Sequence, residues 1–405
     1  MPWKAASVLD ERIRFVLACE RGAETMTSLC AQYGVTRETG YKWLSRYREG
    51  GWAALADQSR APHRQAGTMS PEVSAAIVAL RQERPSWGPK KLRAVLMRRS
   101  PEVSWPAASS IGDLLKREGL VTPRRRDRTV SRARSPFVEP VAPNDLWCID
   151  FKGWFRTRDG RRCDPLTVTD AVSRYLLRCQ ITEPTTAGVW SVCEGLFREC
   201  GLPATLRMDN GPPFASRGAG GLTELSVRWV KLGIRLERIE PGQPQQNGRH
   251  ERMHLTLKQE TSRPPAATAG EQQIRFDRFR QDFNEVRPHE ALDQTTPASC
   301  YQPARRPWPD KLEDPWYDAD HQVRSVRRHG EIKWQGELVF ISVALVGQVV
   351  GLAETPTGDW LVRFADLELG ILDRRQRKFL RFAAPRPGRR KAVQTRDIVS
   401  HVPGP

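Results

Sequence analysis

Apolar residues in the first 50 positions recur at the spacing of short amphipathic helices. From Asp10 to about Gly50 the pattern predicts three helices, with Gly34 as the turn between the last two and Thr36 as a cap for the third. The apolar positions that define them are Ile13, Val16 and Leu17, then Leu29 to Tyr33, then Tyr41, Leu44 and Tyr47. This order is a helix-turn-helix layout whose third helix turns Arg37, Lys42 and Arg46 outward. A plain three-helix bundle with a solvated basic face is the alternative.

A second helical unit follows a linker rich in Pro, Arg and Gln. Ser70 and Pro71 form a helix start, and Pro89 stands at the first turn of the next helix. A further apolar-periodic stretch carries Ile111, Leu114 and Leu115 before Gly119 ends it. The pattern predicts a second helix-turn-helix. The run TPRRRDRTVSRARS after it is either a basic arm that follows a phosphate backbone or a tether without regular structure.

From Asp145 the pattern changes to alternating strands and helices. LWCIDFKGWF and CDPLTVTDAVSRYLLRCQI predict three strands of an antiparallel meander, and Thr185 to Glu199 predicts a helix. The strand TLRM, a helix from about Gly221 to Leu232, the strand IRLERIE and a long helix from about Arg249 to Glu260 complete an α/β unit.

Past Pro307, short β-rich runs broken by Gly predict a small β-barrel, and the last residues form a basic tail. The predicted domains are a helix-turn-helix at 1–62, a second at 68–125, a basic linker at 126–141, an α/β core at 142–303, the barrel at 320–383 and the tail at 384–405.

The charge of the chain points to a polyanionic partner. Its 65 Lys and Arg outnumber 47 Asp and Glu, which gives a net charge of +18, and nucleic acid is the first candidate. A solubilising or membrane-surface charge is the alternative. With nucleic acid as the partner, Arg37, Lys42 and Arg46 become candidate DNA contacts.

The chain shows neither a membrane span nor a secretory signal. No apolar run approaches the roughly 18 residues that a bilayer requires, so we expect a cytoplasmic protein, at the prokaryotic nucleoid if it binds DNA. Eight cysteines without a CxxC pair indicate reduced core residues. His250 and His254 share a helical spacing, but no Cys pair stands at ligand spacing to complete a zinc site.

Three acidic residues stand where a strand or a helix would hold a carboxylate at the edge of the sheet. Asp150 lies within a strand, Asp209 ends a strand at a sharp turn, and Glu251 falls in the first turn of the long helix. Three converging carboxylates repel one another unless cations lie between them, and oxygen ligands suit Mg²⁺ or Mn²⁺. Spacing alone does not single out these three, and the simplest interpretation of the other nearby acids is a surface or capping role: Asp145, Asp164, Asp170 and Glu183.

Four strings in this region resemble the successive motifs of DDE-type insertion-sequence transposases in the retroviral-integrase superfamily. They are WCIDFKGWF, RMDNGPPF, PGQPQQNGRHERMHLTLKQE and NEVRPHEALDQTTPASCY, and they cover roughly Ala142 to Tyr301 in the order typical of that family. The resemblance implies that Asp150, Asp209 and Glu251 are the catalytic metal ligands. Asp209 and Glu251 have 41 residues between them, somewhat more than is common in relatives, and the Gly-rich stretch ASRGAGGLTEL is the expected place of the extra residues.

The resemblance also implies a fold and an activity. The core would be an RNase H-like α/β fold with a mixed sheet, preceded by all-α helix-turn-helix units in place of the zinc module of retroviral integrases. A homo-oligomer on double-stranded DNA would nick the ends of a mobile element and join the 3′-hydroxyl ends to target DNA with Mg²⁺. A DNA-binding regulator with an inactive integrase-like fold and a nuclease without strand transfer are the alternatives.

Several residues around the triad receive narrower interpretations. Lys258 and His254 lie seven and three residues after Glu251, close to the same face of the helix, and are candidate contacts to DNA phosphate. In the RPHEAL segment, Arg287, Pro288 and His289 are expected to serve packing and turns. Trp147 and Trp154 are expected in the core.

Overall fold

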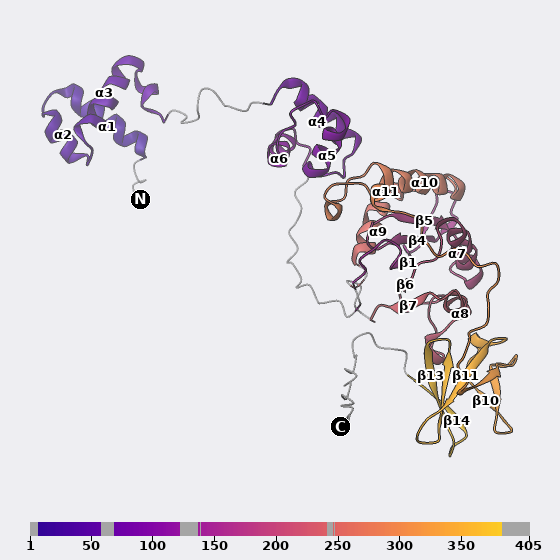
Figure 1. The fold of residues 1–405 in the computed structure, drawn as a ribbon. Coiled ribbons are helices and arrows are strands. Elements are labelled where there is room, and N and C mark those ends of the chain that lie inside the picture. Colours follow the sequence, from indigo (N-terminus) through magenta and orange to yellow (C-terminus); the bar gives the residue numbers. More distant parts are fainter. Residues whose placement is uncertain are drawn as a thin grey trace, which may run out of the picture. The chain divides into compact units, whose positions relative to one another are not determined.

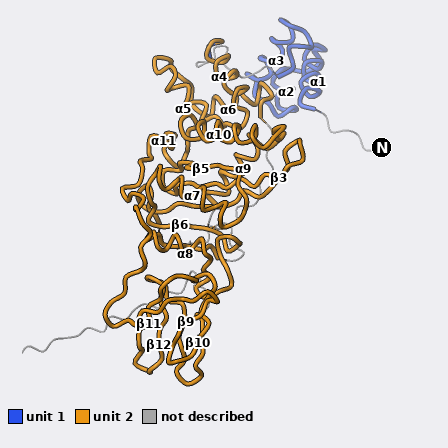
Figure 2. Tube along the Cα trace, turned by 90° about the vertical axis from the view of Figure 1, so that its right-hand side faces the viewer, with its two compact units in different colours: residues 1–70 blue, residues 71–405 orange. Residues whose placement is uncertain are grey.

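The computed structural model describes residues 7–57, 69–121, 137, 139–240, 246 and 248–382. The chain divides into two compact units, Met1–Ser70 and Pro71–Pro405 (Figure 2). Most of the predicted basic linker, much of the loop before the long helix and the predicted tail at 384–405 lie outside the described residues. In the described part of the chain, no helix is long and apolar enough to cross a membrane.

The first unit is the predicted helix-turn-helix. Helices α1 (Val8–Arg21), α2 (Met26–Gln32) and α3 (Arg37–Gly50) are followed by a short 3₁₀ turn, η1 (Trp52–Leu55). Thr36 caps α3, since its hydroxyl accepts from the backbone N–H of Thr39 at 3.3 Å. Gly34 takes φ of 65° at the turn, a conformation that glycine adopts without strain.

The buried face of these helices differs from the predicted one at two positions. Tyr41 is 58% exposed and Leu17 is 40% exposed, so neither belongs to the core. The buried residues of α3 are instead Gly40 and Leu44. A Cβ on Gly40 would lie 2.6 Å from the Cys30 sulfur, so the glycine allows α3 to pack closely on α2.

A second three-helix unit opens the longer part of the chain. It comprises α4 (Pro71–Glu83), α5 (Pro89–Arg99), with Pro89 in its first turn as predicted, and α6 (Ala108–Arg117). The predicted apolar positions of α6 are buried, and Gly119 follows its end with φ of 67°. Arg84 forms an ion pair with Asp282 at 2.7 Å, which links this unit to a helix of the α/β core.

The α/β core is built on a five-stranded mixed sheet with the order β5-β4-β1-β6-β7 (Figure 1). Strands β1 (Trp147–Phe151), β4 (Pro165–Asp170) and β5 (Leu176–Ile181) form the predicted antiparallel meander. Strands β6 (Thr205–Met208) and β7 (Arg235–Arg238) extend it in parallel with β1. A two-stranded hairpin of β2 (Phe155–Arg156) and β3 (Arg162–Cys163) follows β1.

Helices cover both faces of this sheet. On one face, α7 (Thr186–Cys200) and α8 (Glu224–Lys231) bury the largest core cluster against residues of β1, β4 and β6. On the other face, α9 (Gly248–Thr261) and α10 (Ala269–Glu285) pack on β5 through a second cluster. Short turns η2 (Ala219–Gly221) and η4 (Glu290–Leu292) and the short helix α11 (Pro297–Cys300) complete the core.

Helix α10 is an element that the sequence interpretation missed. Its signals are present in the sequence: Thr268 accepts from the N–H of Glu271, and three phenylalanines follow at positions 276, 279 and 283. The prediction stopped at the long helix before it, although this apolar face is needed to cover the sheet.

The last domain is β-rich as predicted, but a closed barrel is not confirmed. Its main sheet is antiparallel and open, with the order β14-β13-β12-β11-β8, so β14 and β8 are its two edges. The strands are β8 (His321–Ser325), β11 (Val349–Glu354), β12 (Trp360–Phe364), β13 (Leu367–Asp373) and β14 (Lys378–Arg381). Strands β9 (Glu331–Trp334) and β10 (Glu337–Phe340) pair only with each other and pack against the edges, and η5 (Val343–Leu345) follows them. The ladder therefore does not close.

Candidate active site

Strand alternation turns two of the predicted carboxylates toward α9. In β1, Trp147 and Ile149 belong to the cluster beneath α7 and α8, so Asp150 faces the opposite side of the sheet. In β6, Leu206 and Met208 belong to the same cluster, and Asp209 comes next on the α9 side. Cys148 is paired with Arg207 in the parallel ladder. Asp150 and Asp209 each lie two residues beyond this pair, and Asp209 directly follows the end of β6.

Glu251 lies in the first turn of α9, as predicted. Its carboxylate and that of Asp209 both act electrostatically on Asp150. The pKa of Asp150 rises to about 7, first because the carboxyl is buried and then because of the charge of Asp209, with a smaller contribution from Glu251. Burial also raises the pKa of Asp209, against the effect of a hydrogen bond from the Gly211 N–H.

This arrangement suits a divalent cation. Three carboxylates provide hard oxygen donors, which Mg²⁺ and Mn²⁺ prefer. A buried carboxyl with a pKa near 7 lacks compensating positive charge, and a bound cation would stabilise its ionised form. The donor chemistry of Asp150, Asp209 and Glu251 therefore fits the predicted metal site.

A hydrogen-bond network joins α9 to the strand next to Asp150. Thr167 of β4 lies directly opposite Asp150 in the sheet, and its hydroxyl is 3.1 Å from the Asp150 carbonyl oxygen. The same hydroxyl is 2.8 Å from Nε2 of His250 and 2.7 Å from Nε2 of His254. The Thr169 hydroxyl lies 2.7 Å from Nδ1 of His250. Both histidines are thereby fixed on the sheet.

The number of available hydrogens decides which group donates and which accepts in each hydrogen bond of this network. The Thr167 hydroxyl has one hydrogen, and the Asp150 carbonyl can only accept, so Nε2 of both histidines must donate to Thr167. Thr169 then donates to Nδ1 of His250. The His250 ring must therefore be neutral, because its Nδ1 accepts while its Nε2 donates. Burial lowers the pKa of His250 well below its usual value and that of His254 to about 3.

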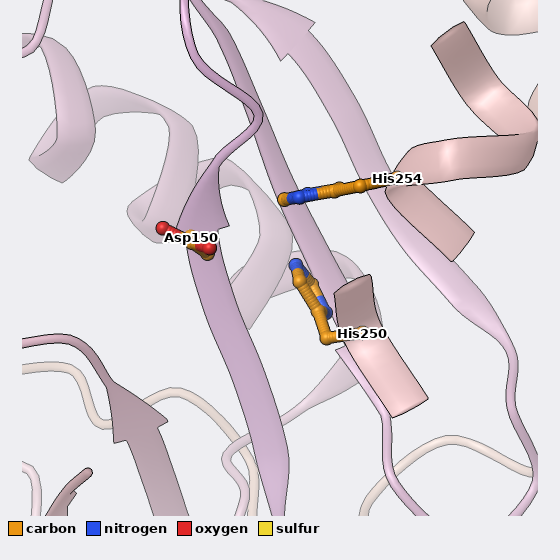
Figure 3. A group of neighbouring side chains, drawn as sticks. All are labelled: Asp150, His250 and His254. Atoms are coloured by element: carbon orange, nitrogen blue, oxygen red, sulfur yellow. The ribbon is translucent and has the colours of Figure 1, made fainter. Parts of the chain in front are cut away.

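Asp150, His250 and His254 also form a group whose potential ligand atoms lie within 4.8 Å of one another (Figure 3). The sequence interpretation found no partner for this histidine pair, and the fold supplies Asp150. Because Nε2 of each ring donates to Thr167, a metal ion on those atoms would have to break the network. We therefore interpret the histidines as supports for α9. The sequence feature that could have predicted this network is a pair of histidines four residues apart on a helix, together with two threonines two residues apart on a strand.

The other predicted residues near the triad separate into two groups. Lys258 is exposed, and its positive charge is the second cause, after burial, of the lowered pKa of Lys152, which directly follows β1. His254 lies in the network without charge, so the structure assigns it packing and not a phosphate contact.

The packing roles expected in the RPHEAL segment are confirmed. Arg287 is 7% exposed and forms an ion pair with Glu260 at 2.7 Å. His289 packs edge-on against Phe283, and its pKa falls to about 3, chiefly because it is buried. Asp170 is a turn residue, as expected of it, since it accepts from the N–H groups of Val172 and Ser173.

In the first unit, the predicted DNA contacts lie on the accessible side of α3. Arg37 and Lys42 are exposed, and Arg46 is partly buried. The guanidinium of Arg46 lies 5.0 Å from the centre of the Trp43 ring. The guanidinium of Arg12 lies 3.8 Å from the same ring. Two arginine side chains, Arg12 and Arg46, therefore pack against the indole of Trp43 at this surface.

The sequence matches families of integrases and of DNA-binding helix-turn-helix domains. Two profiles described as integrase core domains match residues 140–244 and 232–297. A homeodomain-like domain matches residues 39–115, and a helix-turn-helix domain matches residues 11–63. Together with the mixed sheet, these matches define a DNA-binding protein with an integrase core domain.

Two curated relatives come from bacterial insertion elements. The "Insertion element IS407 uncharacterized 31.7 kDa protein" of Burkholderia multivorans is 30% identical over 232 residues, which cover 56% of this chain and 79% of that protein. The "Insertion element IS476 uncharacterized 39.2 kDa protein" of Xanthomonas euvesicatoria is 28% identical over 60% of this chain and 69% of that protein. The chain belongs to the insertion-sequence transposases of the retroviral-integrase superfamily.

Similar solved structures include two retroviral integrases. The catalytic core of HTLV-2 integrase in complex with magnesium is 14% identical, covers 40% of this chain and 99% of its own, and has a TM-score of 0.33. The intasome of simian T-cell lymphotropic virus is 15% identical, covers 72% of this chain and 97% of that chain, and has a TM-score of 0.36. At these scores the family assignment depends on the sequence matches above.

Proposed function

We propose that this transposase nicks the ends of a mobile element and joins the resulting 3′-hydroxyl ends to target DNA, with Asp150, Asp209 and Glu251 as its catalytic residues. The observation that supports the proposal is the electrostatic effect of Asp209 and Glu251 on Asp150, whose pKa is raised first by burial and then by these two carboxylates. Structural carboxylates in this core, such as Asp170, are satisfied by local N–H groups instead.

The three carboxylates would hold Mg²⁺ or Mn²⁺. When bound, the cations activate an attacking oxygen and stabilise a leaving oxygen at phosphorus. The chain itself would fix the carboxylates. Asp150 lies in β1, Asp209 directly follows the adjacent strand β6, and Glu251 lies in α9, which Thr167 anchors through His250 and His254. Lys258, exposed near Lys152, would contact a phosphate beside the reacting one.

The helix-turn-helix would recognise the element ends. Arg37, Lys42 and Arg46 of α3 would enter or flank the major groove, and the second three-helix unit would extend the contact. Because two ends must be joined in one event, we propose a homo-oligomer on double-stranded DNA.

One reaction separates this proposal from its alternatives. Purified protein is mixed with candidate end duplexes, Mg²⁺ and a plasmid, and the products are resolved on gels. Cutting followed by joining is the expected result. Cutting without joining would indicate a nuclease. End binding without cutting would indicate a DNA-binding regulator with an inactive integrase-like core, a second candidate function that is also consistent with the helix-turn-helix units.

A further inference from the structure

The hairpin after β1 carries a large aromatic residue on its surface. Trp154 was expected in the core, but its side chain is 58% exposed, whereas Trp147 is fully buried as predicted. The chain leaves β1 with a hydrogen bond from Lys152 N–H to the Pro165 carbonyl at 3.0 Å and turns at Gly153, where φ is 82°. This turn directs residue 154 away from the sheet.

Two arginines flank the exposed indole. The guanidinium carbons of Arg162 and Arg156 lie 5.2 and 5.9 Å from the centre of the Trp154 ring. Arg162 is held by two hydrogen bonds of 2.7 Å to Asp164, and Arg156 donates to the Gly160 carbonyl at 2.6 Å. The indole and its cations therefore form a preorganised surface.

The hairpin, residues 154–164, is anchored at its tip. The N–H groups of Arg158 and Asp159 donate to the carbonyls of Ala266 and Ala267, both at 3.0 Å. Phe155 packs edge-on against Phe276 of α10, with 6.3 Å between ring centres. The hairpin contains four arginines and two aspartates, which leaves a net positive charge. Its shape is fixed while its outer surface remains basic and aromatic.

Such a surface has the chemistry of a nucleic-acid strand contact. Exposed aromatic rings stack on unpaired bases, and neighbouring arginines contact the phosphates. Trp154 stands only four positions after Asp150, so their Cα atoms lie within about 14 Å of each other, a few nucleotides along a strand.

We propose that the hairpin at 154–164 binds a DNA strand beside the reacting phosphate, with Trp154 stacked on an unpaired base and Arg156 and Arg162 on the backbone. The identity of the reacting phosphate rests on the proposed function. The base can belong to the element end or to the target DNA, because both present the same chemistry. The contact itself can be measured without any reaction.

The test compares two probes with the full-length protein: a duplex with a short central bubble and the fully paired duplex of the same sequence. Trp154→Ala should weaken binding to the bubble duplex by roughly 5-fold to 150-fold, which corresponds to the loss of one base–aromatic stack, and should change binding to the paired duplex less than about 2-fold. Trp154→Phe should retain most of the preference. Trp316→Ala is the matched control, because Trp316 is 81% exposed outside the hairpin.

Two readouts identify the contact and its strand. Arg156→Gln should make the salt dependence of binding shallower by roughly 0.7–0.9 units. If the stacked base belongs to the element, the fluorescence of a 2-aminopurine in the terminal nucleotides of a cleaved end should be quenched by the wild-type protein and not by Trp154→Ala. If the base belongs to the target DNA, Trp154→Ala should instead alter the distribution of joining sites.

Equal losses on bubble and paired DNA, or no loss on either, would overturn the stacking proposal. These results are distinguishable from failure of the proposed function, which would appear as wild-type protein that neither cuts nor joins. A thermal unfolding curve for Trp154→Ala that matches wild type would show that the exposed side chain was removed without loss of the fold.

Discussion

Thr167→Val removes the hydroxyl that connects α9 to the strand beside Asp150, with little change in side-chain volume. Valine cannot accept from the Nε2 groups of His250 and His254 or donate to the Asp150 carbonyl. His250 is 1% exposed, so its N–H would lose its partner without gaining water. His254 is less buried and can recover part of the loss.

The expected magnitude follows from these burials. A buried polar group left without a partner costs about 1–3 kcal/mol, so one fully buried and one partly buried N–H group should together cost about 2–4 kcal/mol. The cost should appear as local opening of α9, because the helix loses its polar attachment to β4. At about 1.4 kcal/mol per tenfold change, amide protection in α9 should fall by roughly 30-fold to 1,000-fold, up to the limit set by unfolding of the whole domain.

Hydrogen exchange of the full-length protein, followed by peptide mass spectrometry, measures this protection. Thr167→Ser is the control, since it keeps the hydroxyl and should cost only about 1 kcal/mol for the lost methyl group. Because Glu251 lies in the first turn of α9, the valine variant should also join DNA more slowly than the serine variant. Equal protection of α9 in the valine variant and wild type would refute the assignment of Thr167 as the centre of the network.

Three further predictions concern catalysis, DNA contact and folding. Replacing Asp150, Asp209 or Glu251 with Ala should abolish nicking and joining but leave end binding nearly intact in gel-shift assays, and near wild-type joining by any one variant would remove that residue from the triad. Lys258→Ala should weaken binding to a cleaved end at every sequence and should make the slope of log affinity against log salt concentration shallower by about one unit. An unchanged slope would show that Lys258 does not contact a phosphate. Gly40→Leu should destabilise the first unit by about 1–3 kcal/mol, because even a Cβ there would lie 2.6 Å from the Cys30 sulfur, and calorimetry that shows no loss would contradict this packing.

Local patterns were sufficient to predict most elements of the α/β core. The period of two in WCIDF identifies β1 and separates Trp147 from Asp150 on opposite faces, and the cap at Thr36 marks the start of α3. The positions of the three acidic residues on their elements also follow from the sequence. These features depend on backbone preferences and on one buried face, and both are encoded within a few residues.

Side-chain environments that depend on distant segments were not predictable in this way. Trp154 was expected in the core, but it follows the turn at Gly153 and is 58% exposed. His254 was expected to contact phosphate because of its helix face, but Thr167, 87 residues earlier, holds it. The closed barrel was not confirmed, because β9 and β10 pair with each other instead of completing the ladder.

The sequence by itself determined the order of the elements, the excess of positive charge and which residues could hold a metal ion. The tertiary structure decided which of these residues meet. The parallel pairing of β1 with β6 and the packing of α9 on the sheet allow Asp209 and Glu251 to act electrostatically on Asp150. Pairing register and helix packing depend on contacts between residues far apart in the chain, and no local pattern specifies those contacts.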